Sequence, residues 1–176
     1  MNARKTSPIL LSVFLLFTSA CAKDITLSEN DHTLFLLWLS DRDNHVIYAV
    51  TTNGECAITD VFPYWKMDDE DGHEEELQWW EEPIYGVDGL AKESDEIWTF
   101  HVAQYPDKTV KATVISVESG DAETITCDFV GIALVDNEEA ILHEVRVDND
   151  GDDVHSVSFY GDSISNATPV TETVLH

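Results

Sequence analysis

Positive charge is scarce in this sequence. Nine lysines and arginines stand against 35 aspartates and glutamates, so the formal net charge at pH 7 is −26. Such a surface repels phosphate backbones and anionic lipid headgroups, which excludes nucleic acid as a partner. Two explanations of the acidity remain open: solubility in a salty habitat, which we favour, and the binding of cations.

Motifs for catalysis or tight metal binding are also missing. The three cysteines include no C-x-x-C pair, and the seven histidines show no zinc spacing such as H-E-x-x-H. The block Gly161-Asp162-Ser163-Ile164 resembles the nucleophile motif of GDSL esterases and lipases, but too little chain follows it to build that α/β fold. We therefore expect no catalytic residues, and we interpret the block as a turn that closes a strand.

The first 22 residues have the pattern of a signal peptide. Arg4 and Lys5 form a positive n-region, and Ile9–Phe17 forms an apolar h-region that is too short to span a bilayer. The remaining chain has the length of one domain with a proper core. We expect a signal peptide at 1–22, a tether at 23–31 and a single β domain at 32–176.

Cys21 follows the small residues Thr-Ser-Ala, as the acylated cysteine does in bacterial lipoprotein signals. A lipid on Cys21 would anchor the protein on the periplasmic side of a membrane in the cell envelope. The alternative is ordinary cleavage at an A-x-A site, which would release a soluble periplasmic or secreted protein that begins at Lys23.

Cys56 and Cys127 then remain as an even pair in an oxidising compartment. Each alternates with apolar residues, which indicates side chains that point inward. A disulfide that closes so long a loop would contribute about 4 kcal/mol on the chain-entropy model. The alternative is two buried free thiols.

Short alternating runs separated by turn residues predict an all-β fold. We expect an antiparallel β-sandwich, or a partly open barrel, of about eight or nine strands with one short helix. Asn53-Gly54 predicts a tight turn, and Pro63 predicts an edge strand. The expected strands are Leu34–Leu39, His45–Thr51, Val61–Met67, Ile97–Gln104, Thr109–Val117, Glu123–Val130, Ile141–Val147 and Val154–Tyr160.

The helix is expected between an N-cap at Asp71 and a stop at Pro83, with Leu77, Trp80 and Ile84 on one face. This arrangement assigns Trp80 to the core. Trp79 cannot share that face, because adjacent residues point in different directions. Trp79 is therefore a candidate exposed platform for a sugar ring or a peptide, but packing at the core or its edge is the interpretation that we favour for each tryptophan.

Acidic turns are the candidate metal sites. Asp148, Asp150 and Asp152 lie in an Asp-rich turn that invites a Ca²⁺ interpretation, but the glycine and glutamate of an EF-hand loop are out of register. We favour a solvated hairpin turn without a cofactor there. The acid-rich run at 68–76 is likewise interpreted as a solvated face, with a cation site as the alternative. His143 and His155 are expected as buried neutral histidines on the inner face of the last hairpin.

Several short motifs occur in a recognisable order. The stretch from Leu39 to Tyr48 contains Asn44, His45 and Val46, and Tyr64-Trp65, Glu75-Glu76-Leu77, Tyr85-Gly86-Val87 and Tyr160-Gly161 follow it. This order resembles the bacterial domain of unknown function numbered 4833, over about residues 33–170. The chain departs from that pattern at Leu39, where a basic residue is expected, and at the acidic Glu81 and Glu82. The resemblance implies a compact exported β domain and brings no activity with it.

We expect an envelope lipoprotein that binds a partner protein or a glycan, or that serves structurally. The alternative is a small envelope hydrolase whose histidine and carboxylates the sequence does not identify. A deep cleft that holds a histidine beside a carboxylate would favour the hydrolase.

Overall fold

The computed structural model describes residues 23–41, 43–68, 72–119, 125–151 and 153–175. The expected signal peptide, Cys21 and Asp152 lie outside these residues. The elements in chain order are β1 (Asp31–Leu39), β2 (His45–Thr52), β3 (Ile58–Lys66), β4 (Glu74–Glu76), α1 (Glu82–Tyr85), β5 (Val87–Lys92), β6 (Ile97–Val102), β7 (Thr109–Ser119), β8 (Ile125–Val135), β9 (Glu138–Asp150), β10 (Asp153–Ser163) and β11 (Pro169–Leu175).

The 11 strands form one open, mixed sheet in the order β4-β3-β2-β1-β9-β8-β7-β6-β5, with β10 and β11 added along β9. The predicted all-β class with one short helix is confirmed, and the sheet is largely antiparallel. The number of strands exceeds the prediction. One pairing is parallel, between 36–39 of β1 and 144–147 of β9.

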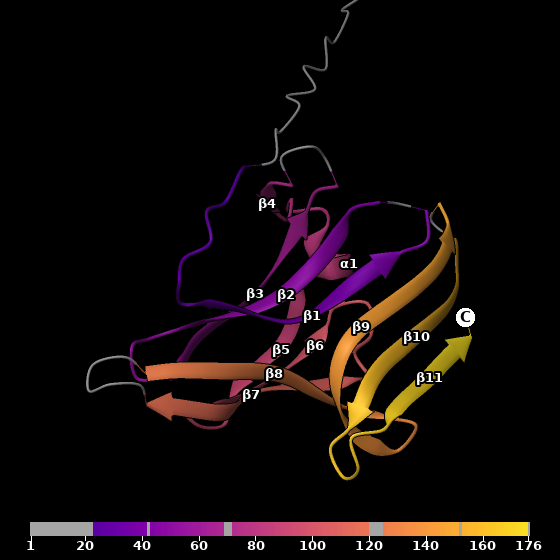
Figure 1. Ribbon diagram of the computed structural model, residues 1–176. Helices are drawn as coiled ribbons and strands as arrows, with labels where there is room; N and C mark the ends of the chain where they lie inside the picture. The colour runs from indigo at the N-terminus through magenta and orange to yellow at the C-terminus, as the bar shows by residue number, and fades with distance from the viewer. Residues whose placement is uncertain (1–22, 42, 69–71, 120–124, 152, 176) are drawn as a thin grey trace, which may run out of the picture.

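Strand β9 is the branch point of the sheet (Figure 1). Its first residues pair with β8, its later residues pair with β1, and β10 runs along almost its whole length. Since β10 occupies one edge of β9, β1 and β8 share the other edge. The sheet therefore divides there into a β1–β4 half and a β5–β8 half.

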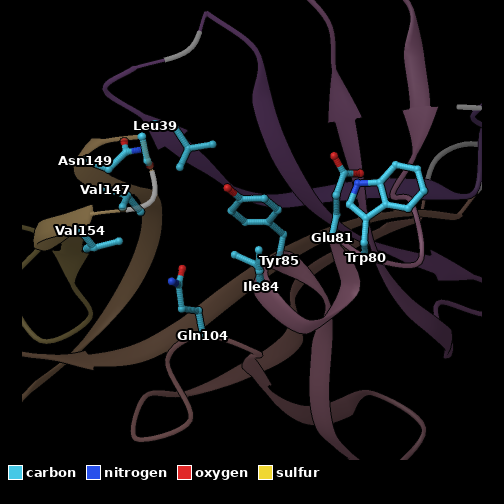
Figure 2. A pocket seen from close by; sticks show the side chains of 10 residues that line it. Leu39, Trp80, Glu81, Ile84, Tyr85, Gln104, Val147, Asn149 and Val154 are labelled. Atoms are coloured by element: carbon cyan, nitrogen blue, oxygen red, sulfur yellow. The ribbon is translucent and has the colours of Figure 1, made fainter. Parts of the chain in front are cut away.

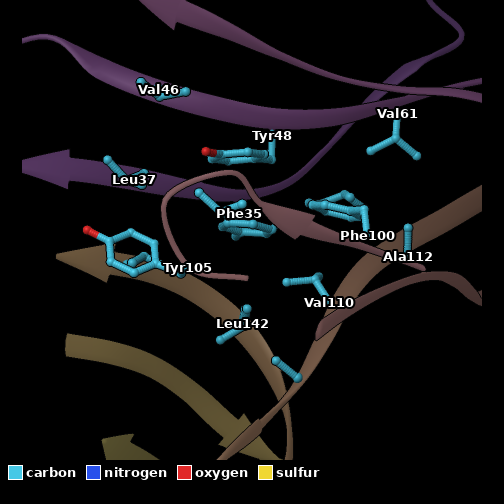
Figure 3. Close-up of a cluster of buried hydrophobic side chains, with 14 of the residues drawn as sticks. Phe35, Leu37, Val46, Tyr48, Val61, Phe100, Tyr105, Val110, Ala112 and Leu142 are labelled. Atoms are coloured by element: carbon cyan, nitrogen blue, oxygen red, sulfur yellow. The ribbon is translucent and has the colours of Figure 1, made fainter. Parts of the chain in front are cut away.

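The core fills the space between the two halves. Phe35 on β1 stacks on Tyr48 of β2 at a centroid distance of 4.6 Å, and the ring of Phe100 on β6 lies 6.4 Å from that of Phe35 (Figure 3). All three side chains are fully buried. Burial of a large apolar side chain contributes about 1.5–3 kcal/mol, so this aromatic group is a main link between the halves.

A disulfide joins the same two halves. Cys56 lies just before β3 and Cys127 lies on β8, with their Cα atoms 6.0 Å apart. The predicted pairing is confirmed. Alternation with apolar residues in the sequence allowed the prediction: it holds for Cys127 on β8, whereas Cys56 reaches the core from the bend before β3.

The predicted helix is wrong in position. Residues 74–76 form β4, which pairs antiparallel with the end of β3, and the helix consists only of Glu82–Tyr85. Pro83 lies in the first turn of α1 and does not end a longer helix. In the first turn of a helix, the missing N–H of proline costs no hydrogen bond. The glutamates that suggested a capped helix form the edge strand instead.

The expectation for the two histidines of the last hairpin is also wrong. His143 and His155 are both exposed. Nε2 of His143 lies 2.9 Å from Oδ2 of Asp162 on the outer face. A bulge between Val154 and Ser156 shifts the register of β10, and no sequence signal marks that bulge.

Candidate functional site

The candidate site is a pocket of about 430 Å³ where the ends of β1, β9 and β10 meet the segment around α1 (Figure 2). Its lining is mixed, with apolar and aromatic walls and a few amide and carboxylate groups. The lining residues are Leu39, Trp80, Glu81, Ile84, Tyr85, Gln104, Val147, Asn149, Gly151 and Val154.

The wall formed by β1 and β9 is held by the parallel pairing of the two strands. Leu39 lies opposite Val147, and the backbone N–H of Ser40 donates to the Val147 carbonyl at 3.0 Å. The Ser40 hydroxyl donates to the Asn149 carbonyl at 3.0 Å and accepts from the Asn149 N–H at 2.9 Å. This reciprocal pair fixes Asn149 at the rim of the pocket.

The opposite wall is held by hydrogen bonds from buried aromatic residues. The Trp65 indole donates to Oε2 of Glu81 at 3.0 Å, and the backbone N–H of Gln78 donates to the same oxygen at 2.8 Å. The buried Tyr48 hydroxyl donates to the Tyr85 carbonyl at 2.8 Å. Because buried donors without partners are costly, these contacts fix the start and the end of α1 on the sheet.

Two tyrosines beneath the pocket remain protonated at neutral pH. Burial, with smaller contributions from Tyr105, Tyr85 and Glu82, holds the pKa of Tyr48 well above its ordinary value. Burial, followed by the neighbouring Tyr85, raises the pKa of Tyr105 to about 12. The Tyr105 hydroxyl donates to Oε1 of Gln104 at 3.3 Å, which orients that amide at the mouth of the pocket.

An apolar rim extends from the pocket to the surface. Trp79 is 78% exposed, Trp80 is 45% exposed and Ile84 is 38% exposed. The two indoles meet edge to face at a centroid distance of 5.5 Å. Trp79 has the exposed position that the candidate platform requires, whereas the packing favoured for both tryptophans, and with it the core position assigned to Trp80, is wrong. Residues 79–81 form a turn, so no helix face carries Trp80 inward.

The chemistry of the pocket suits binding. Among the described lining residues, Glu81 is the sole carboxylate, and none is a histidine, lysine, cysteine or serine. One oxygen of Glu81 already accepts two structural hydrogen bonds. The other titratable side chain among these lining residues is that of Tyr85.

The other predicted site residues do not meet in the described part of the chain. Asp148 and Asp150 are exposed at the end of β9, and Asp152 lies outside the described residues. Ser163 is buried, and its Oγ lies 3.0 Å from Oγ of Ser165. Its neighbour Asp162 contacts His143 instead. The GDSL-like block therefore closes a strand, as the sequence interpretation holds.

Three metal-ligating side chains do come together at the outer edge of the β1–β4 half, where β4 pairs with the end of β3. One donor atom from each of Asp24, His73 and Glu75 lies within 4.8 Å of the others. Sequence reasoning interpreted this region as a solvated face. The available signal was the alternation of His73 and Glu75, which places both side chains on one face of a strand. Asp24 could not be paired with them from spacing alone.

An all-β domain with an open, aromatic-rimmed pocket is the class that fold and site define. The chain belongs to the domain of unknown function family DUF4833, whose family model matches residues 35–173. No curated protein matches the chain, and neither does any solved structure. Among the described residues, no helix is long and apolar enough to cross a membrane.

Residues from some of the motifs that carry the family resemblance lie at the pocket. Leu39 and Tyr85 line it. Tyr48 and Trp65 lie behind it and hold Tyr85 and Glu81 in place. The ring of Trp65 also meets the ring of Tyr85 edge to face at 5.4 Å. Short motifs that are far apart in the sequence thus contribute neighbouring residues to the pocket and to its support.

Proposed function

We propose that this protein is a non-enzymatic lipoprotein of the cell envelope that binds a neutral glycan in the pocket beside Trp80. The observation that carries the proposal is a pocket of about 430 Å³ with two exposed indoles at its rim. Small-molecule sites have volumes of this order, and they combine apolar walls with a few polar groups that orient the ligand.

The polar groups of the pocket suit hydroxyl-bearing ligands. Gln104 and Asn149 carry amides, each of which offers both donors and an acceptor. The indole of Trp80 offers a flat apolar face against which the C–H groups of a sugar ring can pack. Trp79 meets Trp80 edge to face at an interplanar angle of 85°, so it offers a second apolar face at a steep angle to the first.

The charge of the chain restricts the class of ligand. With a formal net charge of −26, the protein repels phosphorylated or otherwise anionic ligands, and Glu81 places one carboxylate in the pocket itself. A neutral oligosaccharide carries no charge to be repelled, and its hydroxyls match the amides. The disulfide between Cys56 and Cys127 fits an oxidising compartment, where envelope glycans occur.

The test is calorimetric titration of the purified chain with neutral tetrasaccharides built of β-linked glucose or N-acetylglucosamine. Weak association is expected, because one indole face and a few amides make a small contact area. Trp80→Ala should weaken the association at least about tenfold, which corresponds to about 1.4 kcal/mol.

Trp38→Ala is the matched control. Trp38 is partly exposed on the outer face of β1, where the Arg146 guanidinium lies 5.5 Å from its ring centre. It should bind the oligosaccharide as the unaltered chain does. The proposal fails if neither sugar binds, if both variants bind equally well, or if the sugar is hydrolysed during the titration.

A further inference from the structure

We propose that Asp24, His73 and Glu75 form a zinc-type metal site that joins the N-terminal segment to β4. The donor atoms of the three side chains lie within 4.8 Å of one another. Nε2 of His73 is 2.9 Å from Oε1 of Glu75. The inference is independent of the glycan proposal, since the two sites share no residue.

The backbone places the three side chains on one face. Asp24 lies directly opposite Glu75 in an antiparallel bridge, so the two side chains point the same way. His73 is two residues before Glu75 and therefore points to that face as well. The bridge is held on both sides, by Ile25 N–H to the Glu74 carbonyl and by Glu76 N–H to the Lys23 carbonyl, each at 3.0 Å.

The two neighbouring glutamates are engaged elsewhere. Glu74 pairs with Lys66 at 2.5 Å, and Glu76 lies 3.9 Å from the ammonium of Lys23. Among the residues that the structure describes, Asp24 and Glu75 are the carboxylates grouped with His73. A bound dication would neutralise both charges, which otherwise repel each other across the bridge.

The donor set matches zinc better than calcium. One imidazole nitrogen and two carboxylates are typical zinc ligands, at metal–ligand distances of about 2.0–2.2 Å. Ligands of a tetrahedral ion at those distances are about 3.3 Å apart, so the observed spacing requires only small side-chain movements. Calcium prefers six to eight oxygen ligands, and an imidazole does not suit it. With three protein ligands, the fourth position is left to water.

A metal in this site would change how the domain is attached. Asp24 is three residues after Cys21, the expected lipid anchor. Coordination would reinforce the backbone bridge that already holds this segment to β4, directly beside the expected anchor. The domain would then be held close to the membrane surface when metal is present.

The experiment titrates zinc chloride into the full chain carrying Cys21→Ala, which removes a thiol that could bind zinc. Cys56 and Cys127 are in a disulfide and do not compete. We expect one zinc ion per chain with micromolar affinity. Co²⁺ should give the visible absorption of a four-coordinate site, and Ca²⁺ at the same ionic strength should not displace it.

His73→Ala and the isosteric Asp24→Asn should each weaken zinc binding at least tenfold. His143→Ala is the matched control, because His143 also lies 2.9 Å from a carboxylate, that of Asp162. No third donor joins that pair among the residues that the structure describes, so this variant should bind zinc unchanged. Equal binding by His73→Ala and His143→Ala would overturn the site, and so would displacement of Co²⁺ by Ca²⁺. Circular dichroism of each variant shows that a loss of binding is not a loss of fold.

Discussion

At Gly161, the backbone of β10 lies so close to the backbone of its partner strand β9 that there is no room for a side chain. A Cβ atom on this residue would lie 2.4 Å from the carbonyl oxygen of Ile141. The register of the two strands shifts at this point, between Tyr160 and Gly161. Gly86 has the same relation to α1, where a Cβ would lie 2.3 Å from the Glu82 carbonyl oxygen. Both glycines follow a tyrosine, so the two Tyr-Gly pairs of the family pattern mark close backbone approaches.

Gly161→Ala should therefore lower the free energy of unfolding by about 1–3 kcal/mol, the usual cost of forcing extra atoms into a packed site. The measurement is urea denaturation followed by tryptophan fluorescence. Gly54→Ala is the control, because nothing lies within 4 Å of a Cβ at that position. A Gly161→Ala protein as stable as the Gly54→Ala protein would show that β10 can move away from β9 at no cost.

Among the elements, β11 is attached by one ion pair in addition to its ladder with β10. Oε2 of Glu172 accepts from Nζ of Lys108 at 2.7 Å and from the Asp136 N–H at 2.8 Å. The hydrogen bond from Lys108 is the main reason that the pKa of Glu172 lies below its ordinary value; the Asp136 N–H and the lysine charge add to it, against partial burial.

A lowered carboxyl pKa in the folded state gives a definite pH dependence. The carboxylate stabilises the fold above its unfolded pKa, about 4.3, and this stabilisation is lost as the pH falls through the folded pKa. Glu172→Gln should lower the free energy of unfolding at pH 7, and the difference from the unaltered chain should disappear near pH 3. Urea denaturation at pH 7, 5 and 3 measures this difference in the free energy of unfolding. Glu93→Gln is the control: Glu93 is exposed between β5 and β6, so its replacement should leave the free energy of unfolding unchanged at all three pH values. A Glu172→Gln difference that persists at pH 3 would contradict this account.

The elements also show how far the sequence could be interpreted. Strands with a buried alternating face, such as Leu34–Leu39 and Ile141–Val147, were predictable because period-two burial is local. Strands β5 and β11 were missed because most of their residues are exposed and leave no such pattern. The parallel pairing of β1 with β9 joins residues about a hundred positions apart, and no local signal encodes it.

The candidate site was predictable only in part, for the same reason. Trp79 was recognised because two adjacent indoles cannot both be buried by one regular element. The pocket itself requires β1, β9 and the α1 segment to meet, and only the tertiary fold brings them together. Trp80 was misplaced because the acidic residues before it suggested a helix that does not form. The disulfide was predictable because both alternation and compartment pointed to it.

At the scale of the whole molecule, the fold is two half-sheets joined by β9, by the aromatic core and by the disulfide. The pocket lies at one end of the β1–β4 half, near Leu39. The bridge of Asp24 to β4 lies beyond β3, on the side where the chain would leave for a lipid anchor. Trp38 pairs with His45, and Lys66 pairs with both His45 and Glu74, so the bridge and the pocket lie at the same ends of these strands, on different edges of the half-sheet.

The measurement that tests this account most directly is capture of a fluorescent neutral oligosaccharide by membranes from cells that express the full chain. Membranes with the unaltered protein should capture the sugar. Cys21→Ala should move both the protein and the capture to the soluble fraction. Membranes with Trp79→Ala and Trp80→Ala combined should hold the protein but capture no sugar. If the unaltered protein is found in the soluble fraction, or if the double variant captures as much sugar as the unaltered protein, the account of an anchored glycan-binding module is wrong.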